Sequence, residues 1–184
     1  MKKALMILLC LAMALGCTAA FAETAEKEYM GTISMNGAFD LRCVLPEGYQ
    51  LTTRLAEPGR YIASILADES KPAMTISIAY NELMSEVERL NDLDDEALAG
   101  IKATFRAEDG VEVSYMETAY GTKLMVVKEI EGVIDYVDFY TVYKGYEIEF
   151  VLTQTEANAG QSITDEQIEI AVKFLSNLDF VSAE

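Results

Sequence analysis

The chain of 184 residues contains no histidine. Histidine is the commonest general base in enzymes and the commonest side-chain ligand of transition metals. Its absence excludes Ser-His-Asp and Cys-His catalysis in their usual forms. The sequence also lacks a nucleophile elbow, a Ser-x-x-Lys pair, a Walker loop and a Gly-x-Gly-x-x-Gly loop. We therefore expect a protein that is not an enzyme and holds no cofactor.

Cysteine is scarce in the part of the chain that we expect to fold. Cys10 and Cys17 lie in the N-terminal region, which leaves Cys43 alone. A single thiol cannot form an intramolecular disulfide, so packing must supply the stability. Cys43 alternates with Phe39 and Leu41, a pattern that predicts a buried position on a strand. A reactive thiol or an intermolecular bridge is the alternative.

Long hydrophobic runs are missing, apart from a short one at the N-terminus. Two lysines precede apolar residues 4–15, and Ala20 and Ala22 supply the small side chains that a signal peptidase reads. The run falls short of the roughly 20 residues that cross a bilayer as a helix. We predict a signal peptide over 1–22, cleaved between Ala22 and Glu23, and a secreted or extracytoplasmic protein with no membrane insertion after cleavage.

A second processing site remains open in the same region. Leu15 and Gly16 precede Cys17, an arrangement close to that used in bacterial lipoprotein processing. Acylation of Cys17 would tether the domain to the membrane as a lipid-anchored accessory protein.

Positive charge is also scarce. The chain has 14 basic and 31 acidic residues, and loss of the leader would change the net charge from −17 to −19. Such a surface repels nucleic acid and anionic headgroups, so we expect neither as a partner.

The periodicity of the remaining chain predicts an α+β domain. Short alternating segments predict strands, and apolar residues at helical spacing predict two helices, one within 83–108 and one from Thr164, where Thr164 and Gln167 have capping-box spacing. For the first helix, Asn91 or Asp92 is the expected cap. The predicted strands cover 38–44, 49–52, 61–67, 73–80, 111–120, 122–130, 133–143 and 146–153.

Glycine-bearing connections join the last four predicted strands. Gly121, Gly132 and Gly145 lie in loops too short for a parallel crossover, so these strands should form an antiparallel meander. We expect a flexible lead-in or short edge element over 23–35 and one domain over 36–184, an antiparallel sheet with two main flanking helices.

Three local segments carry a resemblance to a known family. They are Phe39-Asp40-Leu41 with Leu45-Pro46-Glu47-Gly48-Tyr49, the hairpin Tyr143-Lys144-Gly145-Tyr146, and Phe174-Leu175-Ser176-Asn177-Leu178-Asp179-Phe180. With the order of elements, they resemble the PsbP-like fold family, which includes uncharacterised exported bacterial proteins. The resemblance implies an α/β/α sandwich that works by binding other proteins, and it carries over no functional residue.

Carboxylates offer the main competing chemistry. Residues 91–96 superficially suggest a calcium loop, but Ala97 and Ala103 occupy its glycine and glutamate positions, so a helix N-terminus is favoured. Glu147 and Glu149 share a strand face near the strand that carries Asp135 and Asp138. The sequence therefore leaves open a carboxylate-dependent enzyme or a calcium-binding module.

Tyrosines provide a candidate interaction surface. Tyr136 and Tyr140 lie on one face of a predicted strand, and Tyr143 and Tyr146 flank a turn. Tyrosine is enriched in recognition surfaces, although core packing is the better single explanation of such rings. Our leading expectation is an exported, non-enzymatic domain that binds an unknown protein or small ligand.

Overall fold

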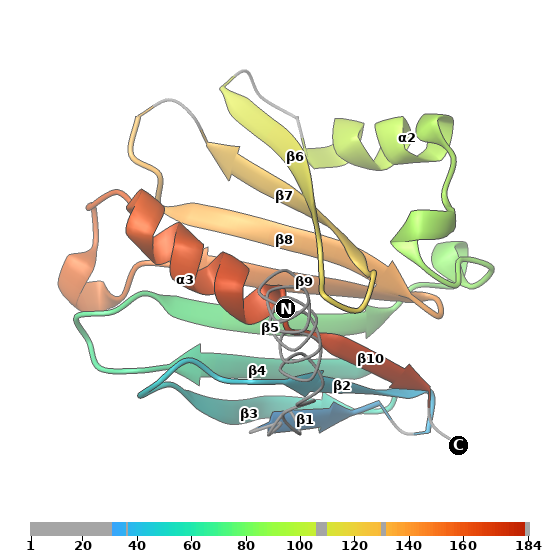
Figure 1. The fold of residues 1–184 in the computed structure, drawn as a ribbon, viewed down its shortest axis with the longest axis horizontal. Helices are drawn as coiled ribbons and strands as arrows, with labels where there is room; N and C mark the ends of the chain where they lie inside the picture. The colour runs from blue at the N-terminus through green and yellow to red at the C-terminus, as the bar shows by residue number, and fades with distance from the viewer. Residues whose placement is uncertain (1–30, 36, 106–109, 130–131, 183–184) are drawn as a thin grey trace, which may run out of the picture.

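Two antiparallel sheets and two α-helices make up the fold. The computed structural model describes residues 31–35, 37–105, 110–129 and 132–182. The large sheet has seven strands in the order β3-β4-β5-β9-β8-β7-β6, and the small sheet has three in the order β1-β2-β10 (Figure 1). The structure thus confirms a mixed α+β class that consists mostly of antiparallel strands.

The large sheet contains the predicted meander. Each strand from β6 to β9 pairs with the next along the chain, and β9 also pairs with β5 along its whole length. The meander therefore continues directly into the earlier strands. The bounds are Gln50–Glu57 for β3, Arg60–Leu66 for β4, Ala73–Tyr80 for β5, Val111–Glu117 for β6, Lys123–Glu129 for β7, Tyr136–Tyr143 for β8 and Tyr146–Thr153 for β9.

The small sheet joins the two ends of the described chain. It consists of β1 (Gly31–Ser34), β2 (Phe39–Cys43) and β10 (Asp179–Ser182), with β2 in the centre. The domain boundary predicted at residue 36 is therefore too late, because β1 pairs with β2 and Ile33 is buried. Of the two alternatives for this segment, the edge element is the one that forms.

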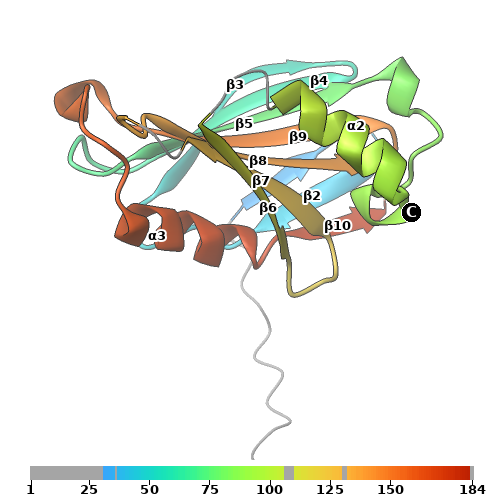
Figure 2. The same cartoon turned by 90° about the horizontal axis from the view of Figure 1, so that it is seen from above.

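Helix α3 begins where the sequence predicts. It spans Asp165–Leu175, and Thr164 and Gln167 form a reciprocal capping box. Ala171, Phe174 and Leu175 are buried against the large sheet. Helix α3 and β10 lie together below this sheet in the view of Figure 2, so one face of the sheet is covered by a helix and by the small sheet.

Helix α2 is shorter than predicted and starts later. It spans Asp95–Phe105, after the 3-10 turns η1 (Glu82–Met84) and η2 (Leu90–Asp92). The backbone N–H of Ala97 donates to Asp94 Oδ1 over 2.8 Å, so Asp94 caps the helix in place of Asn91 or Asp92. The amide side chain of Asn91 instead joins the 3-10 turn to the β6–β7 loop, bonding the backbone of Gly121 and Lys123.

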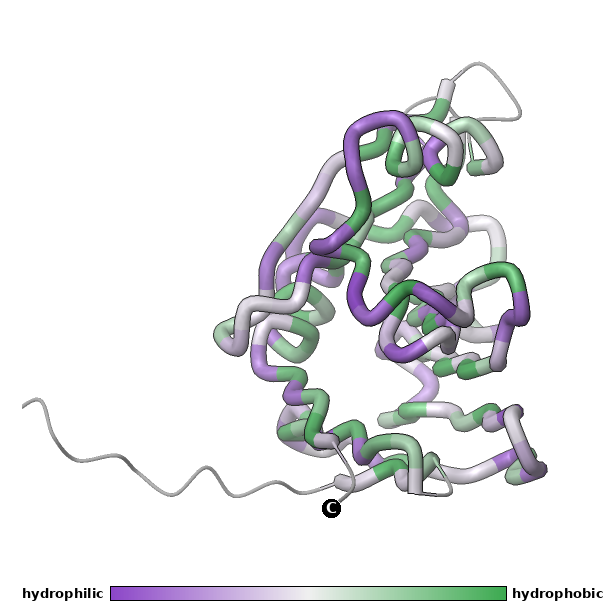
Figure 3. The backbone as a smooth tube through the Cα atoms, turned by 90° about the vertical axis from the view of Figure 1, so that its right-hand side faces the viewer, coloured by the Kyte–Doolittle hydropathy of each residue, from purple (hydrophilic) through white to green (hydrophobic). Residues whose placement is uncertain are grey.

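Alternation along the strands separates two hydrophobic clusters. Hydrophilic and hydrophobic residues alternate along much of the chain (Figure 3). Phe139 and Phe150 belong to the larger cluster, which fills the space between the large sheet, α3 and the small sheet. Tyr140 and Val142 belong to a smaller cluster beneath α2, on the opposite face of the same sheet.

The β8–β9 turn is fixed by close packing. Lys144 and Gly145 both have positive φ, at 51° and 77°, as a tight hairpin turn requires. A Cβ on Gly145 would lie 3.0 Å from the Tyr80 ring and 3.1 Å from Ser85 Cα. Glycine is therefore required here both by conformation and by space.

Two predictions about the N-terminal region lie outside the described residues. These are the cleavage between Ala22 and Glu23 and the acylation of Cys17. No helix in the described ranges is long and apolar enough to cross a membrane.

Candidate functional site

Helix α2 stands over the sheet and leaves a cleft beneath it. The cleft has a volume of about 510 Å³ and is open to solvent. Its lining comes from α2, from the turn before it and from strands β8 and β9. The lining residues are Met84, Ala97, Gly100, Ile101, Thr104, Phe105, Tyr140, Glu147 and Glu149.

Strand register places the polar groups of the cleft. Glu149 lies opposite Tyr140 across the β8–β9 pair, and Glu147 lies opposite Val142. Residues two apart on a strand share a face, so Glu147 and Glu149 both point to the α2 side. On β5 their partners are Ala79 and Ser77, and these small side chains leave the carboxylates uncovered from that direction.

Asp138 lies one step further along the same face. It is 8 % exposed, and its Oδ1 atom has no hydrogen-bond partner. Val127 and Val151 are its neighbours on the two adjacent strands. Burial raises the pKa of Asp138 to about 7, and repulsion from Glu149 acts in the same direction, while the Phe139 backbone N–H opposes both.

The two glutamates differ in their partners. The Tyr140 hydroxyl donates a hydrogen bond to Glu147 Oε1 over 3.0 Å. Partial burial raises the pKa of Glu149, and the charge of Glu147 raises it further. Burial also raises the pKa of Tyr140, and the neighbouring Glu147 adds to this shift, so the hydroxyl stays protonated and acts as a donor.

Among the residues that the structure describes, no lysine or arginine forms an ion pair with these three carboxylates. In the described ranges the ion pair found joins Lys71 to Asp68, far from the cleft in the fold, and it involves none of the three. Unpaired charges in a partly buried site repel each other and are poorly solvated. A bound cation would relieve both effects.

The opposite wall of the cleft is mainly apolar. Ala97, Ile101 and Phe105 come from one side of α2, and the Phe105 ring lies 5.2 Å from the Tyr140 ring. A Cβ on Gly100 would meet no atom within 4 Å, so the helix does not close onto the sheet there. The cleft thus combines an acidic floor with an apolar roof.

No group of three or more acidic or cysteine side chains in the described part of the chain is placed to hold a metal ion. Asp135 is exposed and does not line the cleft. Asp138 is adjacent to the cleft on the same face of the sheet, but it is not one of the lining residues. In residues 91–96, for which a helix N-terminus is favoured over a calcium loop, Asp94 caps α2.

The four predicted interface tyrosines do not form one surface. Tyr140 and Tyr143 are 3 % and 2 % exposed, and they point to opposite faces of β8. Tyr143 packs edge-on against Phe39, and its hydroxyl lies within the core. Tyr136 and Tyr146 are half-buried. A partner could therefore touch at most part of the predicted set.

Cys43 lies in the core, as its alternation predicts. It is fully buried in β2, and its thiol lies 3.6 Å from the Gly31 carbonyl oxygen. Burial raises its pKa to about 11, which disfavours the reactive thiolate.

The sequence pattern indicated the carboxylates of the cleft but not the residues of α2 that form its opposite wall. The spacing of Glu147 and Glu149 shows that they share a face, and Asp138 was a candidate neighbour. Nothing in the pattern indicated that α2 would stand above them, because that depends on tertiary packing. The amphipathic spacing of α2 predicts a buried face without indicating which strands it covers.

No protein-family model matches the chain, and no curated protein matches its sequence.

Proposed function

We propose that this protein is an exported, non-enzymatic binding domain whose α2 cleft takes a small organic cation. The observation that carries the proposal is the set of three neighbouring carboxylates, Asp138, Glu147 and Glu149, which form no ion pair with any lysine or arginine in the described ranges. An ammonium group on the cleft floor would pair with Glu147 and Glu149. The net charge of −17 also favours the approach of cations.

The apolar roof favours an organic cation over a metal ion. Ile101 and Phe105 can cover a hydrocarbon body, and a cation near the Phe105 ring is attracted by its face. Small-ligand pockets usually combine such walls with a few polar groups that fix orientation. Calcium instead needs six to eight oxygen ligands, which this lining does not bring together.

Acid–base catalysis is the second candidate. A carboxyl group with a pKa near 7 is poised for proton transfer at neutral pH. Asp138, however, is 8 % exposed and does not line the cleft, so it would have to act through Glu149 or water. Binding therefore accounts for the geometry more simply.

We also propose how the protein is exported, how it is anchored and to which fold family it belongs. We keep cleavage after Ala22 as the leading form and acylation of Cys17 as the alternative. A PsbP-like sandwich remains the proposed family, supported by the order of strands, helix, meander and helix. This resemblance favours a binding role, in agreement with the cleft.

Calorimetric titration tests the proposal. Benzylamine provides an ammonium group on a small apolar body, benzyl alcohol is its neutral counterpart, and calcium chloride tests the metal alternative. We expect benzylamine alone to bind at pH 8. Replacement of Glu149 in Glu149→Gln should weaken binding about tenfold, since a charge-assisted hydrogen bond is lost.

Asp135→Asn is the matched control. It removes the same charge from an exposed site outside the cleft and should leave the benzylamine affinity unchanged. Equal binding of benzyl alcohol, or equal weakening by Asp135→Asn, would contradict a cation site at this position.

A further inference from the structure

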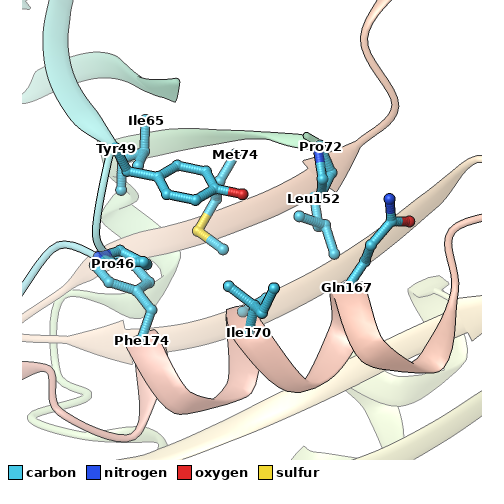
Figure 4. A pocket seen from close by; sticks show the side chains of 10 residues that line it. Pro46, Tyr49, Ile65, Pro72, Met74, Leu152, Gln167, Ile170 and Phe174 are labelled. Carbon is cyan, nitrogen blue, oxygen red and sulfur yellow. The ribbon is translucent and has the colours of Figure 1, made fainter. Parts of the chain in front are cut away.

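A second groove lies on the opposite face of the large sheet, where α3 meets the β2–β3 loop. Figure 4 shows its deep end, with Ile170 and Phe174 of α3 facing Pro46 and Tyr49 of the loop. This end is a narrow slot of about 20 Å³. Met74 and Leu152 of the large sheet lie at its bottom.

The slot opens into a wider groove of about 430 Å³. Pro46, Tyr49, Ile170 and Phe174 line both, so the two are continuous. The combined volume suits a small organic ligand, for which pockets of roughly 300–1,000 Å³ are usual. The other residues of the wider part are Val44, Leu45, Glu47, Lys71, Lys173 and Asn177.

The wider part carries two lysines in a strongly acidic protein. Lys71 lies 3.9 Å from Asp68 and 5.8 Å from the centre of the Tyr49 ring. Lys173 is exposed at the end of α3 and forms no ion pair with another described residue. Glu47 is the acidic residue of the lining. At 0.1 M salt, screening limits the effect of exposed charges to about 10 Å, so the charged groups of the groove dominate its electrostatic interaction with a ligand.

We propose that this groove binds one amphiphilic anion, with its hydrocarbon chain along Pro46, Tyr49, Ile170 and Phe174 and its anionic end between Lys71 and Lys173. Ile170 supports this arrangement, since it is 38 % exposed on a helix whose other apolar residues turn inward. The bound chain would cover it. The slot has room for little more than the end of such a chain.

A single amphiphile fits better than a membrane surface. The net charge of −17 opposes contact with an anionic bilayer, whereas one molecule needs only the local lysines. The site is independent of the α2 cleft, because it lies on the other face and selects the opposite charge. Failure of either proposal leaves the other unaffected.

Titration with dodecanoate below its micellar concentration tests this site. We expect saturable binding with one site per chain, and no comparable binding of dodecyltrimethylammonium or dodecanol. In the purified protein, amide signals of residues 44–49 and 170–177 should shift in heteronuclear NMR spectra. These shifts locate the site without any substitution.

A double variant sharpens the test. Lys71→Gln with Lys173→Gln should weaken dodecanoate binding at least about tenfold, because both charge-assisted contacts are lost. The matched control, Lys102→Gln with Lys128→Gln, removes two lysines elsewhere and should leave the affinity unchanged. Circular dichroism checks that both variants are folded.

Three results would overturn the proposal. The first is equal affinity for the cationic and anionic dodecyl chains, which would indicate an apolar surface without charge selection. The second is dodecanoate binding that the double variant leaves intact. The third is binding to phosphatidylglycerol vesicles with none to monomeric dodecanoate, which would identify a lipid surface as the ligand.

Discussion

The two faces of the large sheet differ in how their polar groups are satisfied, although adjacent residues of the same strands form them. On the core face, Thr141 is fully buried and its hydroxyl donates to the Lys123 carbonyl oxygen over 2.8 Å. On the α2 face, Asp138 is almost as buried and its Oδ1 has no partner. Buried polar groups are normally paired, so a carboxylate oxygen without a partner supports the binding role proposed for this face.

The covering elements differ in the same way. Helix α3 and the small sheet close the core face, and α3 buries Ala171, Phe174 and Leu175. Helix α2 buries Leu98 alone and leaves a cleft beside it. Elements that bury few apolar contacts open more easily, which suits ligand entry.

Truncation of a ring on the core face should have the largest effect. Phe150 is fully buried, so Phe150→Ala should lower the free energy of unfolding by about 3–5 kcal/mol. The adjacent Val151 points to the other face and is half-buried, and Val151→Ala should lower it by only about 1 kcal/mol. Urea unfolding measures both. Equal losses would contradict the division of the sheet into a packed and an open face.

Removal of the buried charge should have the next largest effect, with the opposite sign. Asp138→Asn should raise the free energy of unfolding on the order of 2 kcal/mol at pH 8, because an ionised carboxylate no longer has to be buried. The reason is that the folded-state pKa, about 7, lies above the ordinary aspartate pKa of 3.8. Urea unfolding at pH 8 checks the sign.

The same shift fixes the pH dependence of stability. The favourable contribution of protonated Asp138 is fully present below pH 3.8 and is lost as the pH rises through about 7. The difference between Asp138→Asn and the parent protein should therefore shrink between pH 8 and pH 5. A difference that stays constant over this interval would show that Asp138 does not titrate there.

Loss of a helix cap should have the smallest effect. Thr164→Ala removes half of the capping box of α3 and should lower the free energy of unfolding by about 1 kcal/mol. Asp94→Ala removes the cap of α2. Hydrogen exchange of the α2 amides in Asp94→Ala should accelerate more than hydrogen exchange of the α3 amides in Thr164→Ala. The reverse order would show that α2 is the more firmly held helix.

Local signals account for most of the elements found in the structure. Alternation locates β5 and β9 with the bounds observed, and Thr164 with Gln167 marks the start of α3. Strand β10 was not predicted, because its four residues form a strand only by pairing with β2 at the far end of the chain. The domain boundary at residue 36 was too late for the same reason, although a short edge element was one of the two alternatives for residues 31–35.

The part of the candidate site that lies on the sheet was predictable from the sequence, whereas the part that α2 contributes was not. Period-two spacing places Glu147 and Glu149 on one face, but the register that sets Asp138 diagonal to Glu149 depends on the β8–β9 turn. The start of α2 was misjudged, because Asn91 bonds the β6–β7 loop instead of capping the helix. Contacts between distant segments leave no local trace in the sequence.

The central claim is that the carboxylates on the α2 face of the sheet bind a cation. The number of protons exchanged when an amine binds tests this claim most directly. Calorimetric titration of benzylamine at pH 7, in two buffers of different ionisation enthalpy, gives the number of protons exchanged. Because a bound cation lowers the pKa of Asp138 and Glu149, binding should release protons. Asp138→Asn should release fewer protons, because one of the two titrating carboxyl groups is absent. Binding with no proton release, or with proton uptake, would contradict the account.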